Sequence, residues 1–168
     1  NTDAWGNFYL DLKQFYDNID VAKVIHKADK LDFPPVELYM CLTIYLAPRI
    51  ARACGVYSKP IIPYNSIVAG CFNANNGARA MLYDILEEAH ARAPLILARQ
   101  FVDDINARAE GHRHMVRHQL LTAAETLVDG CLASGLPVSD KSLVLVTDPR
   151  IAAGIQDLMS KKGITIRR

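Results

Sequence analysis

The chain has 168 residues, of which 51% are apolar and 22% are charged, a composition typical of a folded globular protein. This composition excludes an intrinsically disordered tail and a collagen-like repeat. Lysine and arginine total 19 against 18 aspartates and glutamates, so the net charge of +1 does not by itself indicate a nucleic-acid or membrane partner.

The sequence contains no apolar stretch long enough to cross a bilayer and no signal-peptide pattern. We therefore expect an intracellular protein with reduced thiols and no membrane partner. Because the chain opens with Asn rather than Met, we also expect it to be a piece of a longer protein.

Apolar alternation and helical spacing of apolar residues predict the elements of the first half of the chain. Asp20 has the side chain of a helix N-cap, and Gly55 is suited to the position just after a helix. In chain order, the predicted elements are a strand at residues 8–12, a short helix after Asp20, a helix at 36–54 ended by Gly55, and a loop with an extended piece at 56–69.

The second half shows a stronger alternation between strand and helix patterns. Its predicted elements are a helix at 73–93, a hairpin of strands at 95–102 and 105–109, a helix at 112–134, a strand at 142–147, a helix at 151–162, and a last short strand at 164–166. Strands interleaved with helices predict a layered α+β or α/β fold.

Two strongly apolar strands carry carboxylates, at Asp11 and at the adjacent pair Asp103-Asp104. We expect the pair at the tip of the predicted hairpin, where Asp-Asp is a poor choice because adjacent like charges repel. A solvated turn, in which aspartate is common, is the alternative. If Asp11 lies on a neighbouring strand, the three carboxylates form an oxygen-rich site suited to Mg²⁺ and to two-metal phosphoryl transfer.

Three short motifs occur in the order and at the spacing of a known family. Residues 9–19 read Tyr-Leu-Asp-Leu-Lys-Gln-Phe-Tyr-Asp-Asn-Ile and resemble motif A of reverse transcriptases. Phe-Val-Asp-Asp at 101–104 resembles motif C, the Y-x-D-D box, and residues 135–142 resemble the motif D loop, whose lysine leads into a strand. The long interval between motifs A and B is similar to that of non-LTR retroelements.

This resemblance implies an α+β polymerase palm, with a small antiparallel sheet backed by helices. It covers residues 1–168 as a single palm fragment, with motif A near 8–19, motif B near 69–93, motif C at 101–104 and motif D near 135–142. The fingers and thumb of the family have no counterpart in this chain, so the isolated fragment is expected to be a poor enzyme.

The resemblance also implies a role for each matching residue. Asp11 and Asp103 correspond to the ligands of two Mg²⁺ (or Mn²⁺) ions, with Asp104 as the neighbouring carboxylate. Tyr16 matches the aromatic residue that excludes a 2′-hydroxyl, and Lys141 matches the lysine proposed to protonate departing pyrophosphate. The implied partners are an RNA or DNA template with its primer and deoxynucleoside triphosphates.

Motif B departs from the family pattern. Ala69-Gly70 stands where the family has Gln-Gly, and the following Ser-Pro pair is missing. Gly70 would still let the backbone approach a nucleotide closely. The leading hypothesis is the palm of an RNA-directed DNA polymerase, and the alternative is a degenerate or domesticated fragment that binds nucleic acid or a protein without chemistry. A nucleotide cyclase is a third hypothesis, although such enzymes place glycines where Phe101-Val102 stand.

Several candidates also have plain structural interpretations. Tyr16 is suited to core packing, and Lys141 to an exposed surface position. His114 and His118 have a metal-ligand spacing but no third ligand, which favours a solvated helix face. The basic cluster at 108–118 predicts a solvated helix start, with contact to a phosphate backbone as the alternative.

Overall fold

The computed structural model describes residues 3–167, and the chain divides into two compact units. The sheet unit comprises the N-terminal segment up to Phe15 and everything from Leu82 onward. The helical unit comprises Tyr16–Met81. The long helix α4 (Ala74–Arg92) begins in the helical unit and ends in the sheet unit.

The sheet unit is built on four strands that pair in the order β4-β5-β1-β6, with every neighbouring pair antiparallel. The strands are β1 (Asp3–Asp11), β4 (Leu97–Phe101), β5 (Asp104–His112) and β6 (Leu143–Val146). Because β5 lies between β1 and β4, and β1 between β5 and β6, this is a split β-α-β arrangement. The expected α+β class with a small antiparallel sheet is confirmed.

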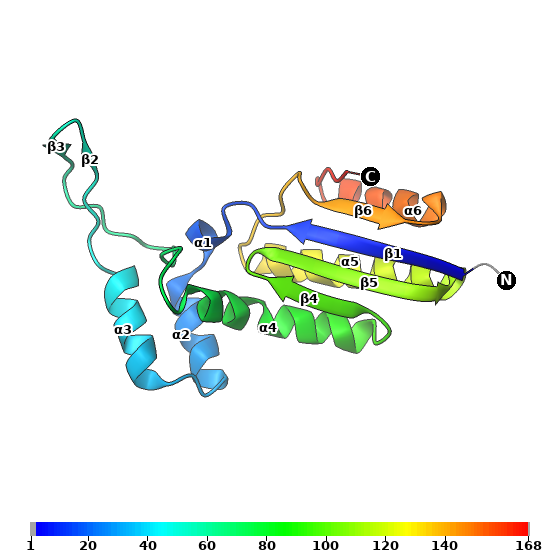
Figure 1. The fold of residues 1–168 in the computed structure, drawn as a ribbon, viewed down its shortest axis with the longest axis horizontal. Coiled ribbons are helices and arrows are strands. Elements are labelled where there is room, and N and C mark those ends of the chain that lie inside the picture. The colour runs from blue at the N-terminus through cyan, green and yellow to red at the C-terminus, as the bar shows by residue number, and fades with distance from the viewer. Residues whose placement is uncertain (1–2, 168) are drawn as a thin grey trace. The chain divides into compact units, whose positions relative to one another are not determined.

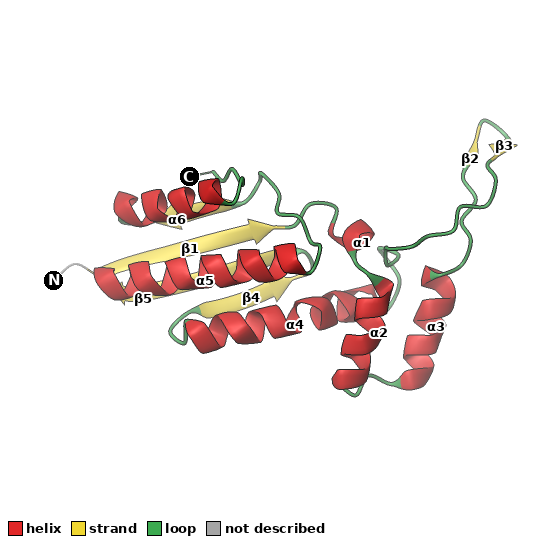
Figure 2. Cartoon of the chain, turned by 180° about the vertical axis from the view of Figure 1, so that it is seen from behind, coloured by secondary structure: helices red, strands yellow, loops and turns green. Residues whose placement is uncertain are grey.

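Helices cover one face of this sheet and leave the other face open (Figures 1 and 2). The covering helices are α5 (Arg113–Ala133), α6 (Pro149–Lys161) and the C-terminal part of α4. Phe8 and Leu10 of β1 are fully buried on the helical side, as are Leu120 and Leu127 of α5. Each such side chain contributes about 1.5–3 kcal/mol by leaving water, so this core holds β1 and β5 in register.

The helical unit contains α2 (Val21–Lys30), α3 (Pro35–Tyr45) and the two short strands β2 (Arg52–Ala53) and β3 (Val56–Tyr57). The short helix α1 (Phe15–Asn18) starts at the boundary between the units. Asp20 caps α2 as predicted, since its Oδ1 accepts hydrogen bonds from Ala22 N at 2.8 Å and Lys23 N at 3.4 Å.

The predicted helix at 36–54 is wrong in its second half. Helix α3 ends at Tyr45, and the chain then forms the β2–β3 hairpin. Cys54 and Gly55 both have positive φ angles, +49° and +79°, which is the pattern of a two-residue type I′ turn. Gly55 therefore closes a hairpin and not a helix.

The other predicted elements are confirmed with shifted ends, apart from the last strand. β1 starts at Asp3, five residues earlier than predicted. The predicted strand at 164–166 is absent from the structure; an isolated bridge between Leu143 and Arg167 stands in its place. Within residues 3–167, no helix combines the length and the apolar composition needed to cross a membrane.

Candidate functional site

The three predicted carboxylates lie at one end of the sheet. Asp11 is the last residue of β1, and its Cα partner in the antiparallel ladder is Asp104, the first residue of β5. Asp103 lies immediately before β5, in the turn that joins β4 to β5. The two strands that carry the acids are therefore neighbours in the sheet, which sequence periodicity could not test.

The β4–β5 turn differs by one residue from the prediction. Phe101 and Asp104 pair across the ladder, so the two central turn residues are Val102 and Asp103 rather than the two aspartates. Val102 has a φ of +57°, a left-handed conformation that β-branched residues rarely adopt. Gln100 Nε2 donates a hydrogen bond to the Val102 carbonyl at 2.9 Å, which supports this strained turn.

Two buried serines attach the loop at 137–142 to the end of β1. Asp11 N donates to Ser142 Oγ at 3.1 Å, and Ser139 N donates to the Asp11 carbonyl at 2.9 Å. Lys13 N adds a hydrogen bond to the Pro137 carbonyl at 2.8 Å. Because Lys141 lies between the two serines, these bonds bring its side chain to the carboxylates.

The electrostatics of the site centre on Asp104. Partial burial raises the pKa of the Asp104 carboxyl above its usual range, and the negative charges of Asp103 and Asp11 add to this effect. A hydrogen bond with the Asp11 side chain also raises it, while the positive charge of Lys141 lowers it. The three carboxylates and the lysine line adjoining hollows, which places their charges close enough to interact.

Two hollows meet at this end of the sheet, and both are lined by Asp11 and Lys141. The first has a volume of about 520 Å³ on the open face and is also lined by Tyr9, Arg99, Phe101 and Asp104. The second, of about 570 Å³, is also lined by Gln14, Asp103 and Ser139. Asp11 therefore shares one hollow with Asp104 and the other with Asp103.

The donor set has the chemistry of a magnesium or manganese site, because carboxylate oxygens are the ligands that these hard cations prefer. Among residues 3–167, no three His, Cys, Asp or Glu side chains gather closely enough to hold an ion as they stand. Asp11 shares one hollow with Asp104 and the other with Asp103, so these pairs are the residues that could hold such an ion. A cation would offset the mutual repulsion that raises the pKa of Asp104.

Tyr16 and Gly70, the predicted nucleotide-binding residues, belong to the helical unit. The Tyr16 hydroxyl donates a hydrogen bond to Asn75 Oδ1 at 2.9 Å, and the Tyr16 carbonyl accepts one from Ile67 N at 3.0 Å. Gly70 has a φ of +85°, and open space lies where a Cβ would be. Its backbone conformation, and not a close neighbour, is what calls for glycine there.

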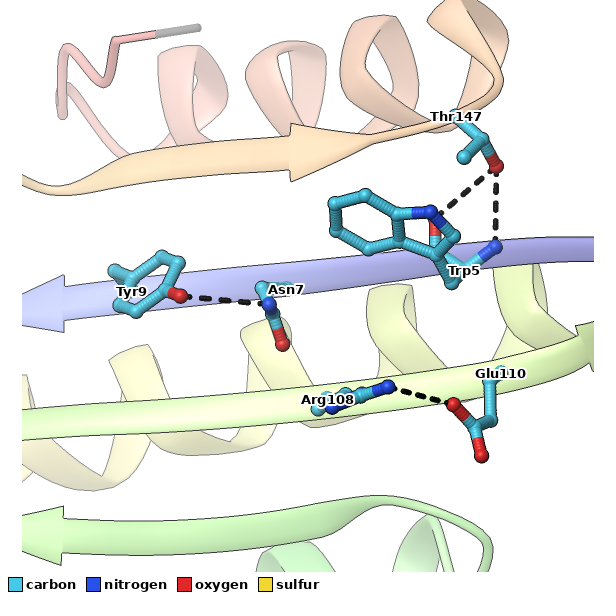
Figure 3. Close-up of polar contacts among 6 residues, drawn as sticks. All are labelled: Trp5, Asn7, Tyr9, Arg108, Glu110 and Thr147. Carbon is cyan, nitrogen blue, oxygen red and sulfur yellow. Dashed lines mark hydrogen bonds and ion pairs between the residues drawn. The ribbon is translucent and has the colours of Figure 1, made fainter.

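The open face of the sheet carries a mixture of aromatic and charged side chains (Figure 3). Arg108 forms an ion pair with Glu110 at 2.8 Å, and Asn7 Nδ2 donates to the Tyr9 hydroxyl at 3.4 Å. At the far end, Trp5 N donates to Thr147 Oγ1 at 3.0 Å. These contacts lie on the same face as Asp11 and Asp104, because alternate residues of a strand share a face.

Much of the predicted basic cluster at 108–118 makes contacts within the protein. Arg113 Nε forms an ion pair with Asp148 at 2.7 Å, in addition to the Arg108–Glu110 pair. The rings of His112 and His114 stack with centroids 5.5 Å apart. These contacts support the structural interpretation of the cluster. No third ligand joins His114 and His118 within the part of the chain that the structure describes.

Sequence reasoning missed several residues of the site. Ser139 and Ser142 hold the backbone of Asp11, and Arg99 lines the open-face hollow beside Asp104. A serine three residues from another in a loop is too common to indicate this role. The alternation of the 95–102 strand does place Arg99 two residues from Phe101, and that spacing could have identified a shared face.

In comparisons with known proteins, no protein-family model and no curated protein matches the chain. A functional assignment therefore depends on the residues and geometry of the site.

Proposed function

We propose that this chain is the palm of an RNA-directed DNA polymerase, which transfers deoxynucleotides to the 3′ end of a primer. The observation that carries the proposal is the convergence of Asp11, Asp103, Asp104 and Lys141 at one end of an antiparallel sheet. Like charges that converge in this way destabilise a fold, and a cation-dependent reaction on phosphates would account for why the chain carries them.

In the proposed reaction the primer 3′-oxygen attacks the α-phosphorus of a deoxynucleoside triphosphate. A new phosphodiester bond forms, the bond to pyrophosphate breaks, and the 3′-hydroxyl proton passes to solvent. A pair of Mg²⁺ ions, when bound, would stabilise the attacking and leaving oxygens. Asp11 and Asp103 would hold these ions, and Asp104 would supply further negative charge beside them.

Lys141 is the residue to which we assign the role of general acid. It lines both hollows with Asp11 and lies close enough to Asp104 to influence its pKa. In the proposed reaction it gives a proton to the departing pyrophosphate, which is a poorer leaving group when fully ionised. Tyr16 and Gly70 are proposed to select a deoxynucleotide and to approach it closely, as their motif positions imply.

The test is primer extension by the chain with a template-primer, deoxynucleoside triphosphates and Mg²⁺ or Mn²⁺. We expect Asp103→Asn to lower the rate by at least roughly 100-fold, the scale of losing one preorganised electrostatic group. Asp157→Asn, which neutralises an exposed aspartate of α6 paired with Lys161, is the matched control and should leave the rate unchanged. Extension that survives Asp103→Asn would overturn the proposal.

A catalytically silent domain that binds nucleic acid or a protein is the second candidate. Two observations favour it: the Ala69-Gly70 departure in motif B and the lack of a ready three-ligand group among the described residues. Calorimetric titration with Mn²⁺ separates the two candidates without any need for turnover. Binding that Asp11→Asn abolishes supports the polymerase, whereas equal binding by both proteins supports the silent domain.

A further inference from the structure

The helical unit contains a long segment without acidic residues. Between Glu37 and Asp84 the chain has no aspartate or glutamate, although 18 occur in the whole sequence. The same segment carries four basic residues, Arg49, Arg52, Lys59 and Arg79. Because it lacks acids, this segment has a net positive charge although the whole chain has a net charge of only +1, and a region of net positive charge favours binding of a polyanion.

Three of these basic residues lie on a two-stranded ribbon formed by residues 49–61, here called the ribbon arm. Arg49 and Ile61 exchange two backbone hydrogen bonds of 2.8 Å, and Ser58 N donates to the Ala51 carbonyl at 2.9 Å. Strands β2 and β3 continue the pairing to the tight turn at Cys54-Gly55 (Figure 1). This ladder fixes the spacing of the side chains on the ribbon arm.

The side chains that the ribbon arm presents combine positive charge with aromatic surface. Arg52 and Tyr57 are cross-strand partners, and the Arg52 guanidinium lies over the Tyr57 ring at 5.4 Å from its centroid. Tyr57 is 63% exposed. Lys59 is two residues beyond Tyr57 and is also exposed, so an extended backbone places both on the same side of the ribbon.

A guanidinium stacked on an exposed tyrosine, with a second cation beside it, matches the chemistry of one nucleotide. Arg52 and Lys59 suit phosphate oxygens, and the Tyr57 ring offers a face on which an unpaired base stacks. An isolated two-stranded ribbon is only marginally stable in water, so a bound strand would also stabilise the arm. We propose that the ribbon arm binds single-stranded nucleic acid through Arg52, Tyr57 and Lys59.

This inference does not depend on catalysis by the sheet unit. The test is fluorescence anisotropy of a labelled single strand of about 12 nucleotides with the whole chain in EDTA, without nucleotides, at several salt concentrations. Arg52→Gln with Lys59→Gln should reduce the slope of log affinity against log salt by about 1.4, since each lost phosphate contact on a single strand removes about 0.7. Tyr57→Leu should weaken binding by roughly 5- to 150-fold and leave the slope unchanged.

The matched control removes two exposed cations from α6 instead, by Arg150→Gln with Lys161→Gln. It has the same net charge as the ribbon-arm double variant and should keep the parent salt slope. Equal losses in both double variants would show a nonspecific charge effect and overturn the proposal, as would the absence of binding in the parent. Self-association that Tyr57→Leu abolishes and the oligonucleotide does not displace would instead assign the ribbon arm to a copy of this chain.

The two proposals can be refuted independently of each other. Asp103→Asn should bind the oligonucleotide as the parent does, because EDTA removes divalent ions and Asp103 lies in the sheet unit. If primer extension is lost only in the ribbon-arm variants, the proposal for the carboxylate site is therefore not contradicted. If the parent chain binds the oligonucleotide normally but shows no primer extension, the proposal for the ribbon arm is not contradicted.

Discussion

Asp11 and Asp104 face each other across the last pair of the β1–β5 ladder, and the negative charge of Asp11 helps to raise the pKa of the Asp104 carboxyl. Like charges directly opposite each other in an antiparallel pair destabilise a sheet. Asp103, one residue away in the turn, adds a third negative charge. This end of the sheet is thus less stable than neutral residues would make it.

Replacement of Asp104 by Asn should stabilise the chain at neutral pH. The folded-state pKa of Asp104 is raised, so the fold loses stability as pH rises from the ordinary aspartate range through the raised value. The amide removes that loss. We expect a gain of about 0.5 kcal/mol at pH 7 after allowance for solvent screening, or roughly 1–2 °C in Tm.

The same measurement at lower pH is the control for this prediction. Below the ordinary aspartate range the carboxyl is protonated in both the folded and the unfolded chain, so the parent and Asp104→Asn should have nearly equal Tm values. Scanning calorimetry from about pH 2 to pH 7, in steps of about 1 pH unit, measures the difference in Tm between the two proteins. A gain that stays constant across the range would show that charge at Asp104 is not its cause.

The strain at Val102 leads to a second prediction. A left-handed conformation costs a residue with a Cβ about 1–2 kcal/mol, and glycine avoids this cost. Glycine also loses more backbone entropy on folding, so Val102→Gly should stabilise the chain by only about 0.5–1 kcal/mol. Val102→Ala keeps a Cβ and the positive φ, and should show little of this gain. Urea denaturation of the three proteins measures the differences, and a loss of stability in Val102→Gly would contradict the assigned turn.

The fold of the sheet unit was largely predictable because its signals are local. Alternation in β5 and helical spacing in α5 indicate burial on one face, because burial follows the period of the element. The carboxylates were found because acids beside apolar strands break that pattern. The sequence could not show that Asp11 pairs with Asp104, because strand pairing depends on contacts nearly a hundred residues apart.

The errors have equally specific causes. Residues 36–54 are almost continuously apolar, and such a run does not distinguish a long helix from a helix followed by a hairpin. Pro48 was the local signal, because proline lacks the N–H that a helix interior requires. The turn at Val102-Asp103 was misplaced by one residue because valine rarely adopts a positive φ and so does not indicate a turn. Only the pairing of Phe101 with Asp104 reveals where the turn lies.

Two glycines should respond to alanine in opposite directions. A Cβ at Gly6 of β1 would lie 2.5 Å from Leu120 Cδ1 and 2.6 Å from Val146 Cγ1, so Gly6→Ala should cost about 1–3 kcal/mol through overpacking. A Cβ at Gly154 of α6 would lie 3.5 Å from Leu121 Cδ2, an ordinary contact. Gly154→Ala should therefore stabilise the helix by about 0.5–1 kcal/mol. Urea denaturation tests both, and a neutral Gly6→Ala would mean that the Leu120 and Val146 side chains shift to make room for the added methyl group.

Lys141 provides the last prediction, which links electrostatics to the proposed reaction. Its positive charge lowers the pKa of Asp104, so Lys141→Met should raise that pKa further above its usual range. Carbon-13 NMR of the Asp104 carboxyl measures this shift, with Lys161→Met on α6 as a control that should leave it unchanged. If Lys141 is also the general acid, the chemical step of extension should slow by about 10²- to 10⁴-fold. A shifted pKa with an unchanged rate would leave Lys141 as a neighbouring charge and remove it from the reaction.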